Sequence, residues 1–338
     1  MGSLVEGGGL SITCANQNPT RTQTAVAGAL GLPLATVDVR VRRIGGAYGG
    51  KLNAHLPTAI AAAVAAAKHG RPVRLHNDRS DDMASTGGRP PMEGSFRLAV
   101  DQGGVVSSIE LTAAFDSGVV DGGAGDLTMG VCWADNAYRA DDFAVHGSFY
   151  NSGVVGSAAC FPGGVTIPLH ELAMEAAAEA VGLPADAVRE ANLYATGDAA
   201  LCGVTVGENG FNWNLPAMWQ SAKARWEVEA FNRSNRWRKR GLRMVPVKYG
   251  IEDNGGAYKE GCSLGVLADG SVRLAHGGCE LGQGIHTKAA QAAAFALGCP
   301  LGGVSVSDTS SLATPGSADT GGSATSECVV KARCWTLD

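Results

Sequence analysis

The sequence predicts a mixed fold of helices and strands in two domains, and three observations lead to this prediction. With 338 residues, the chain is long enough for two domains of ordinary size. Runs in which apolar and polar residues alternate, as in strands, are interspersed with runs that have the apolar periodicity of helices. A looser stretch at 199–215 divides the chain, so we expect a first domain at 1–200 and a second at 201–338.

Helices are predicted where capping residues and apolar stripes agree. Gly31 closes a helix at 22–30, and Pro57 and Gly70 bound an alanine-rich helix at 57–68. Further helices are expected at 169–181, 184–194, 217–238 and 288–297. The aromatic residues of the long helix are interpreted as core anchors: Trp219, Trp226, Phe231 and Trp237.

Strands are predicted from period-two alternation and from the turns between them. They are expected at 37–42, 95–101, 105–115, 271–276 and 302–308. Two hairpins follow from glycine-containing turns, one across 102–104 and one across Asp269-Gly270.

The composition excludes several classes of protein. The net charge of −5 gives no basic surface for nucleic acid. No run of 18 apolar residues occurs, and the first residues lack the basic start of a signal peptide, so no membrane span is predicted. The nine cysteines include no Cys-x-x-Cys pair, which argues against disulfide, zinc and iron–sulfur frameworks. We therefore expect reduced thiols and a cytoplasmic location.

The chain is organised around a glycine-rich loop, Gly-Gly-Cys-Glu-Leu-Gly-Gln-Gly-Ile-His-Thr-Lys, at 277–288. It follows a predicted strand and leads into a predicted helix. Glycines let the backbone approach a ligand, and the free N–H groups of a first helical turn favour an anion. Gln283 stands between two glycines, where its amide can both donate and accept. We expect an anion-binding loop here.

A second glycine-rich turn, 45–51, matches the first seven positions of a Walker A loop. Leu52 then lacks the hydroxyl that would hold magnesium. Pro57 also falls inside the helix that such a loop would begin, at a cost of about 3 kcal/mol in a helix interior. The nucleotide-binding interpretation is therefore kept only as an alternative to a turn for close packing.

Both loops resemble those of the xanthine dehydrogenase and aldehyde oxidase family, the molybdenum hydroxylases. That family has a pterin-contacting loop like 277–288 and a Gly-Gly-Gly-Phe-Gly-Gly-Lys-Glu turn like 45–52, and the resemblance runs from about residue 6 to 328. It implies an α+β, two-domain architecture that binds molybdenum-molybdopterin, with the second domain truncated here. It places these residues at the cofactor: Gln17, Gly46, Ala47, Tyr48, Gly282, Gln283, Gly322 and Ser323.

The resemblance also implies roles for two of these residues. Gln17 would hydrogen-bond an oxygen on molybdenum without being a direct metal ligand. Tyr48 stands where the family has a Phe that packs beside the metal site. The phosphate of the pyranopterin would be the anion at the 277–288 loop.

Four departures from the family pattern concern the substrate. Leu52 replaces a Glu that contacts the purine in xanthine-oxidising members, and Met129 falls near a substrate-binding Arg. Phe161 lies at the position of an Arg near the metal site, and Gly163 replaces an aromatic residue of the slot for a flat substrate. The first change favours aldehydes or other heteroaromatics over xanthine, although 237–242 and 277–288 are closer to the xanthine dehydrogenase branch.

The Gly-Glu-Pro-Pro segment that carries the family's catalytic base does not occur in the sequence, so no catalytic residue is assigned. We expect a fragment whose full-length form is a homodimer with FAD and [2Fe-2S] groups in other regions. Three functions stay open. The first is part of an oxidoreductase that hydroxylates an N-heterocycle or aldehyde with water as oxygen source. The others are an inactive fragment or paralogue, and a nucleotide-binding module using 45–51.

Overall fold

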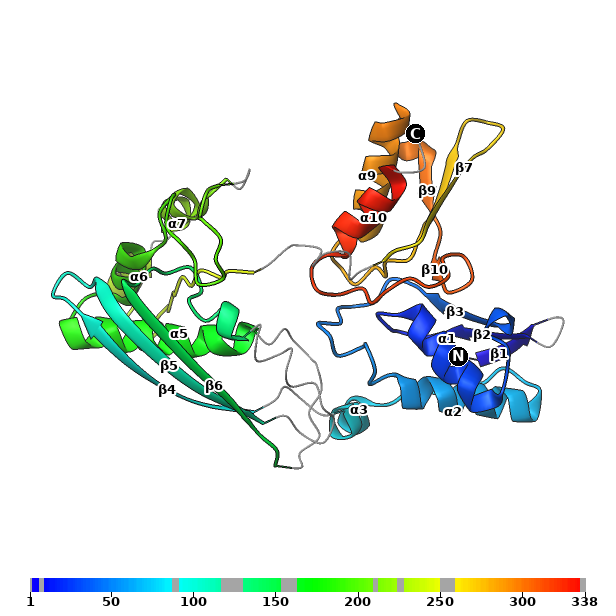
Figure 1. Ribbon diagram of the computed structural model, residues 1–338, viewed down its shortest axis with the longest axis horizontal. Helices are drawn as coiled ribbons and strands as arrows, with labels where there is room; N and C mark the ends of the chain where they lie inside the picture. The colour runs from blue at the N-terminus through cyan, green and yellow to red at the C-terminus, as the bar shows by residue number, and fades with distance from the viewer. Residues whose placement is uncertain are drawn as a thin grey trace. The chain divides into compact units, whose positions relative to one another are not determined.

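The computed structural model describes residues 2–5, 9–86, 91–116, 130–152, 163–208, 212–223, 228–249 and 259–334 (Figure 1). The chain divides into two compact units. The first takes its elements from both ends of the chain, within 2–86 and 259–334, and the second takes them from within 91–249. No helix in the described ranges is both long and apolar enough to cross a membrane.

The N-terminal part of the first unit is a small sheet covered by helices. Strands β1 (Gly2–Val5), β2 (Gly9–Thr13), β3 (Val37–Val41) and β10 (Thr309–Ser310) lie in the order β1-β2-β3-β10. β2 and β3 are parallel because α1 (Pro19–Leu30) and the short 3₁₀ helix η1 (Leu34–Thr36) carry the chain back between them. α2 (Leu56–His69) packs on α1, and α3 (Arg79–Thr86) follows it. The core includes Leu10, Ile12, Val26, Val37, Val39 and Ala63.

Capping explains the helix boundaries in this sheet layer. α1 begins three residues before its predicted start because the Asn18 side chain accepts a hydrogen bond from Arg21 N at 2.8 Å. Its end at Gly31, with φ of 64°, is confirmed. α2 also has its proline in the first turn and a left-handed glycine, Gly70, at its end, as predicted.

The C-terminal part of the first unit is a second sheet with two helices. β7 (Cys262–Val266) and β8 (Val272–His276) form the predicted antiparallel hairpin, and β9 (Val304–Val306) lies parallel to β8. Helix α9 (Ile285–Leu297) and the 3₁₀ helix η2 (Leu301–Gly303) connect β8 to β9, and α10 (Thr325–Cys334) packs on α9. Leu274, Ile285, Ala289, Ala293 and Val329 form the core.

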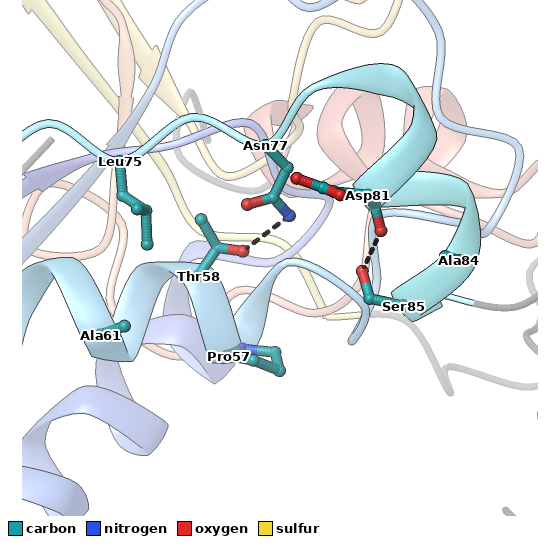
Figure 2. Close-up of a pocket in the computed structure, with 8 residues that line it drawn as sticks. All are labelled: Pro57, Thr58, Ala61, Leu75, Asn77, Asp81, Ala84 and Ser85. Atoms are coloured by element: carbon teal, nitrogen blue, oxygen red, sulfur yellow. Dashed lines mark hydrogen bonds between the residues drawn. The ribbon is translucent and has the colours of Figure 1, made fainter.

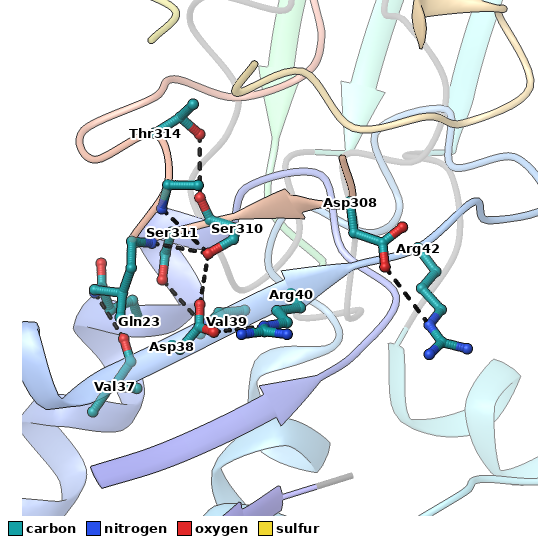
Figure 3. Close-up of polar contacts among 12 residues, drawn as sticks. Gln23, Val37, Asp38, Val39, Arg40, Arg42, Asp308, Ser310, Ser311 and Thr314 are labelled. Atoms are coloured by element: carbon teal, nitrogen blue, oxygen red, sulfur yellow. Dashed lines mark hydrogen bonds and ion pairs between the residues drawn. The ribbon is translucent and has the colours of Figure 1, made fainter. Parts of the chain in front are cut away.

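The strand β10 joins the two ends of the chain into one unit (Figure 3). Ser310 Oγ donates to Asp38 Oδ1 at 2.7 Å, and Ser311 Oγ accepts from Val39 N at 3.0 Å. Ser311 N donates in return to Val39 O at 2.9 Å. Because β10 is only two residues long, these side-chain bonds supply much of its attachment to β3. The two glycine-rich loops of the sequence are thereby parts of one folded body.

The second unit is a three-stranded sheet packed on a long helix. β4 (Met92–Val100) and β5 (Val106–Asp116) form the predicted hairpin, and β6 (Asp142–Tyr150) adds in parallel to β5. α5 (Gly163–Val181) packs on this sheet and on α6 (Ala185–Asn192); α7 (Leu215–Lys223) and α8 (Val228–Ser234) follow. Arg189 of α6 is 1% exposed and pairs with Glu171 at 2.7 Å and Glu175 at 2.8 Å.

The aromatic residues predicted as core anchors differ in how deeply they are buried. Trp219 is buried in the core of the second unit, as predicted. Trp237 is 85% exposed, so the prediction is wrong there. The reason is that α8 ends at Ser234, four residues before the predicted end, and the Arg236 guanidinium lies over the Trp237 ring at 4.7 Å. Residue 226 lies outside the described residues.

Candidate functional site

Four segments that are distant in the sequence meet within the first unit. They are the residues after β2, the turn at 44–51, the loop at 277–284 and the turn at 320–324. Backbone hydrogen bonds join the second and third: Ile44 N donates to Glu280 O, and Gly46 N donates to Leu281 O, each at 3.0 Å. The two glycine-rich loops are therefore direct neighbours.

Gln17 connects the turn at 44–51 with the turn at 320–324. It is 2% exposed; its Nε2 donates to Thr320 O at 2.9 Å and its Oε1 accepts from Lys51 N at 3.1 Å. Main-chain bonds reinforce both contacts, from Gln17 N to Lys51 O at 3.0 Å and from Thr320 N to Gln17 O at 2.8 Å. A glutamine amide carries two N–H groups, and the Thr320 bond uses one of them.

Thr320 closes the ring of segments. Its buried hydroxyl accepts from Cys279 N at 2.8 Å, which ties the 320–324 turn to the glycine loop. Gly322 and Ser323 follow with φ values of 61° and 58°, and both are exposed. The positive φ of Ser323 is uncommon for a residue with a side chain, which marks the turn as held in shape by its surroundings.

Gly46 and Tyr48 shape the surface of the 44–51 turn. Gly46 has φ of 77°, and a Cβ there would lie 3.0 Å from Tyr48 Cε2. Tyr48 also has a positive φ, 53°, and is 78% exposed. Ala47 O accepts from Gly50 N at 2.9 Å, which makes the turn tight. An aromatic ring is thus displayed at the site with most of its surface uncovered.

Lys51 does not have the position of a P-loop lysine. Its Nζ donates to Gly46 O at 2.7 Å, so the ammonium is turned back on its own turn. The next helix, α2, begins only at Leu56. A P-loop needs its lysine at the start of a helix, next to the phosphates. The structure therefore disfavours the nucleotide-binding alternative.

Glu280 occupies the N-terminal end of α9. It is 7% exposed; Oε1 accepts from Gly282 N at 2.9 Å and Gly284 N at 3.0 Å, and Oε2 accepts from His286 N at 3.2 Å. Burial acts to raise the pKa of Glu280, but these three N–H groups outweigh it and hold the pKa below its usual value. The expectation that the N–H groups of this turn are free for a bound anion is wrong for these three.

Gln283 folds back onto the loop that carries it. Its Oε1 accepts from Leu281 N at 2.6 Å, and its Nε2 donates to Cys279 O at 3.0 Å. Gly282 and Gly284 on either side have φ of 109° and 78°, conformations that favour glycine. Gln283 is exposed, as predicted for this turn.

Three titratable side chains lie next to the loop. His276, at the end of β8, is buried, and its Nε2 lies 2.9 Å from His286 Nδ1. Burial and the neighbouring imidazole lower the pKa of His276 to about 4, so the pair is neutral near pH 7. Glu260, before β7, lies where a Cβ on Gly277 would meet its Oε2 at 2.3 Å, and burial raises its pKa to about 8.

An open pocket of about 540 Å³ lies elsewhere in the first unit, between α2, the segment after it and α3 (Figure 2). It is lined by Pro57, Thr58, Ala61, Leu75, Asn77, Asp81, Ala84 and Ser85. Asn77 Nδ2 donates to Thr58 Oγ1 at 3.2 Å, and Asp81 N donates to Asp78 Oδ1 at 2.9 Å. None of the residues assigned to the cofactor lines this pocket.

The structure places all eight residues assigned to the cofactor in the first unit, on the four joined segments. Sequence reasoning assigns no individual role to Glu280, to Thr320 or to the His276–His286 pair. The sequence does contain a signal for the role of Glu280. The residue stands just before the glycines at the start of a helix, and a helix N-terminus favours a carboxylate. Residues 129 and 161 lie outside the described residues, and Gly163 is the first residue of α5.

Comparisons with known proteins find matches over most of the chain. Two family models, each described as a molybdopterin cofactor-binding domain, match residues 2–193 and 216–334. Xanthine dehydrogenase/oxidase of Rattus norvegicus is 36% identical over 95% of the chain, and aldehyde oxidase 2 of the same species is 33% identical over 90%. The chain spans 25% and 23% of these two relatives, about a quarter of their length.

Solved structures share the fold. The aldehyde oxidoreductase from Desulfovibrio gigas aligns with a TM-score of 0.74 and 20% identity, over 98% of this chain and 37% of that one. Quinoline 2-oxidoreductase from Pseudomonas putida 86 aligns with a TM-score of 0.68 and 18% identity, over 99% of this chain and 46% of that one.

Proposed function

The chain belongs to the molybdopterin cofactor-binding domain family, and from this premise we propose that the joined glycine loops of its first unit contact the pterin. The residues that would hold the group are Gln17, Gly46, Ala47, Tyr48, Gly282, Gln283, Gly322 and Ser323. The proposal depends on two backbone hydrogen bonds, from Ile44 N to Glu280 O and from Gly46 N to Leu281 O. These bonds join the two glycine-rich loops into one continuous surface.

The residues at this surface fit a flat, polar group. Gly282 and Gly322 are exposed and bring the backbone within reach of a ligand. Gln17 supplies a buried amide between two of the segments, and Tyr48 supplies an exposed aromatic face for packing against a ring. The surface therefore offers neutral hydrogen-bond donors and one aromatic side chain.

A second part of the proposal concerns the reaction. When bound, a molybdenum cofactor supplies hydroxylation of an electron-poor carbon with oxygen from water. We propose that the larger protein acts on an N-heterocycle or an aldehyde, which the names of the relatives support. Within this chain, Gln17 would orient the cofactor through its amide. Leu52 would leave the substrate site without the carboxylate that contacts the purine in xanthine-oxidising members. No residue of this chain is proposed as the catalytic base.

We also propose a domain division, a cellular compartment and an oligomeric state. The two family matches support a first domain at 1–200 and a second at 201–338, whereas the compact units of the fold combine segments from both of these ranges. The thiols of Cys14 and Cys279, neither of which is in a disulfide, support a reducing, cytoplasmic compartment. We also propose a homodimer for the full-length form, which sedimentation of that form would test.

The experiment that tests cofactor binding is measurement of pterin and molybdenum in the purified chain. The chain is produced in a host that makes molybdenum cofactor, the pterin is released by oxidation and measured by fluorescence, and molybdenum is measured by mass spectrometry. Near-stoichiometric pterin that falls in Gln17→Ala supports the proposal. Pterin at the level of an unrelated protein from the same host contradicts it.

A further inference from the structure

We propose that Glu280 is a positioning residue: its carboxylate fills the anion-binding backbone at the start of α9 and fixes the glycine loop in the shape that the pterin contacts. This inference rests on the proposed function of the same loop. It gives the site a charged residue that does not itself touch the cofactor.

The geometry of the carboxylate carries the first step. Both oxygens are used, Oε1 by Gly282 N and Gly284 N and Oε2 by His286 N, at 2.9, 3.0 and 3.2 Å. Hydrogen bonds from backbone N–H groups to a buried carboxylate are charge-assisted and stronger than neutral ones. Two of the three donors belong to glycines with positive φ, so the carboxylate stabilises the least regular part of the loop.

The main chain of Glu280 carries the second step. Its carbonyl accepts from Ile44 N, and the carbonyl of the next residue, Leu281, accepts from Gly46 N, each at 3.0 Å. The position of the 44–46 turn therefore depends on the backbone that the Glu280 side chain holds. One residue fixes both glycine-rich loops, the first through its carbonyl and the second through its carboxylate.

Electrostatics carry the third step. The low pKa of Glu280 means that the carboxylate stays ionised at neutral pH, next to the positive end of the α9 dipole. A phosphate group would need the same N–H donors and would be repelled by this charge. The pterin is then received on the outer surface of the loop, where Gly282 and Gln283 are exposed, and any phosphate is held by other donors.

The test compares Glu280→Gln and Glu280→Ala with Glu327→Gln, which makes the same charge change in the first turn of α10 in the same unit. A glutamine side chain at position 280 has only one acceptor oxygen. Its NH₂ group would face a backbone N–H of the loop, so at least one hydrogen bond of the carboxylate would be lost. Hydrogen exchange measured by mass spectrometry should be faster by about tenfold or more over 44–50 and 281–288 in Glu280→Gln, because a buried charge-assisted bond is lost. Glu327→Gln should leave both segments unchanged.

Two further readouts separate this inference from the proposed function. Inorganic phosphate should raise the melting temperature of Glu280→Ala, whose N–H donors are set free, and leave wild type unchanged. Pterin content should fall severalfold in Glu280→Gln and stay at the wild-type level in Glu327→Gln. Wild-type exchange rates in Glu280→Gln, or full pterin content in both Glu280 variants, would overturn the positioning role. Pterin missing already from wild type contradicts the proposed function, and the exchange and phosphate results then still decide whether Glu280 holds the loop.

Discussion

Gln17 and Thr320, which are 303 residues apart in the chain, hold each other through two hydrogen bonds. Gln17 Nε2 donates to Thr320 O at 2.9 Å, and Thr320 N donates to Gln17 O at 2.8 Å. Because Thr320 Oγ1 also accepts from Cys279 N, the contact connects three segments of the cofactor surface. The surface is therefore assembled by tertiary structure and depends on the correct packing of both ends of the chain.

Gly46→Ala should destabilise the first unit. The substitution places a Cβ at φ of 77° and 3.0 Å from Tyr48 Cε2, so we expect a loss of about 1–2 kcal/mol in the free energy of unfolding. Urea denaturation measures this loss. The control is Gly45→Ala, because a Cβ there meets nothing within 4 Å. Equal stability of the two variants would contradict the role assigned to Gly46.

Arg189→Met should destabilise the second unit far more than Arg97→Met. The Arg189 side chain is buried and pairs with Glu171 and Glu175. Its removal leaves the largely buried Glu171 carboxylate without its cation, which should lower the free energy of unfolding by about 3–5 kcal/mol. Arg97 pairs with Glu110 at an exposed site, where such pairs contribute about 0–1 kcal/mol. Denaturant unfolding followed by tryptophan fluorescence compares the two. A similar loss in both would show that burial does not govern this network.

Some of the fold could be predicted from the sequence because its signals are local. The hairpin at Asp269-Gly270 is confirmed: Gly270 has the positive φ that the turn requires, and Asp269 accepts from Ser271 N at 2.9 Å. Strand β10 was not predicted, since two residues carry no periodicity and its attachment depends on Asp38 and Val39. Trp237 was misassigned because helical spacing indicates a buried face only as far as the helix continues.

The cofactor surface was less predictable than the fold. The resemblance identified residues on four segments, but sequence alone gave no physical reason for these segments to meet. The main-chain bonds between 44–46 and 280–281 are invisible in the sequence because any residue except proline can make them. The role of Glu280 is hidden for a related reason, since a glycine-rich loop before a helix indicates a site for an external anion, whereas here the chain's own carboxylate accepts these hydrogen bonds.

Glu260→Gln should change how stability depends on pH. Burial raises the pKa of Glu260 from about 4.5 to about 8 on folding, so the folded state keeps a proton that the unfolded state loses. The contribution of Glu260 to stability is complete below pH 4.5 and is lost as the pH rises toward 8. Glutamine cannot ionise, so the variant should gain stability relative to wild type by an amount on the order of a few kcal/mol between pH 5 and 9.

The measurement for Glu260 is the free energy of unfolding of both proteins at several pH values. Glu327→Gln serves as the control for the change from a carboxylate to an amide. A difference between Glu260→Gln and wild type that stays constant from pH 5 to 9 would show that Glu260 is ionised in the folded protein.

Gln283→Ala should lower pterin content without unfolding the chain. The side chain is exposed and its two bonds stay within the loop, so its loss should cost about 1–2 kcal/mol in the free energy of unfolding. The Leu281 and Cys279 backbone groups would lose their partner, and the loop that displays Gly282 would change shape. Gln291→Ala is the matched control, because Gln291 is an exposed glutamine of α9 outside the loop.

Pterin released by oxidation is measured in both variants, with circular dichroism as the check on folding. Equal pterin in both variants, with the fold intact, would remove Gln283 from the cofactor surface.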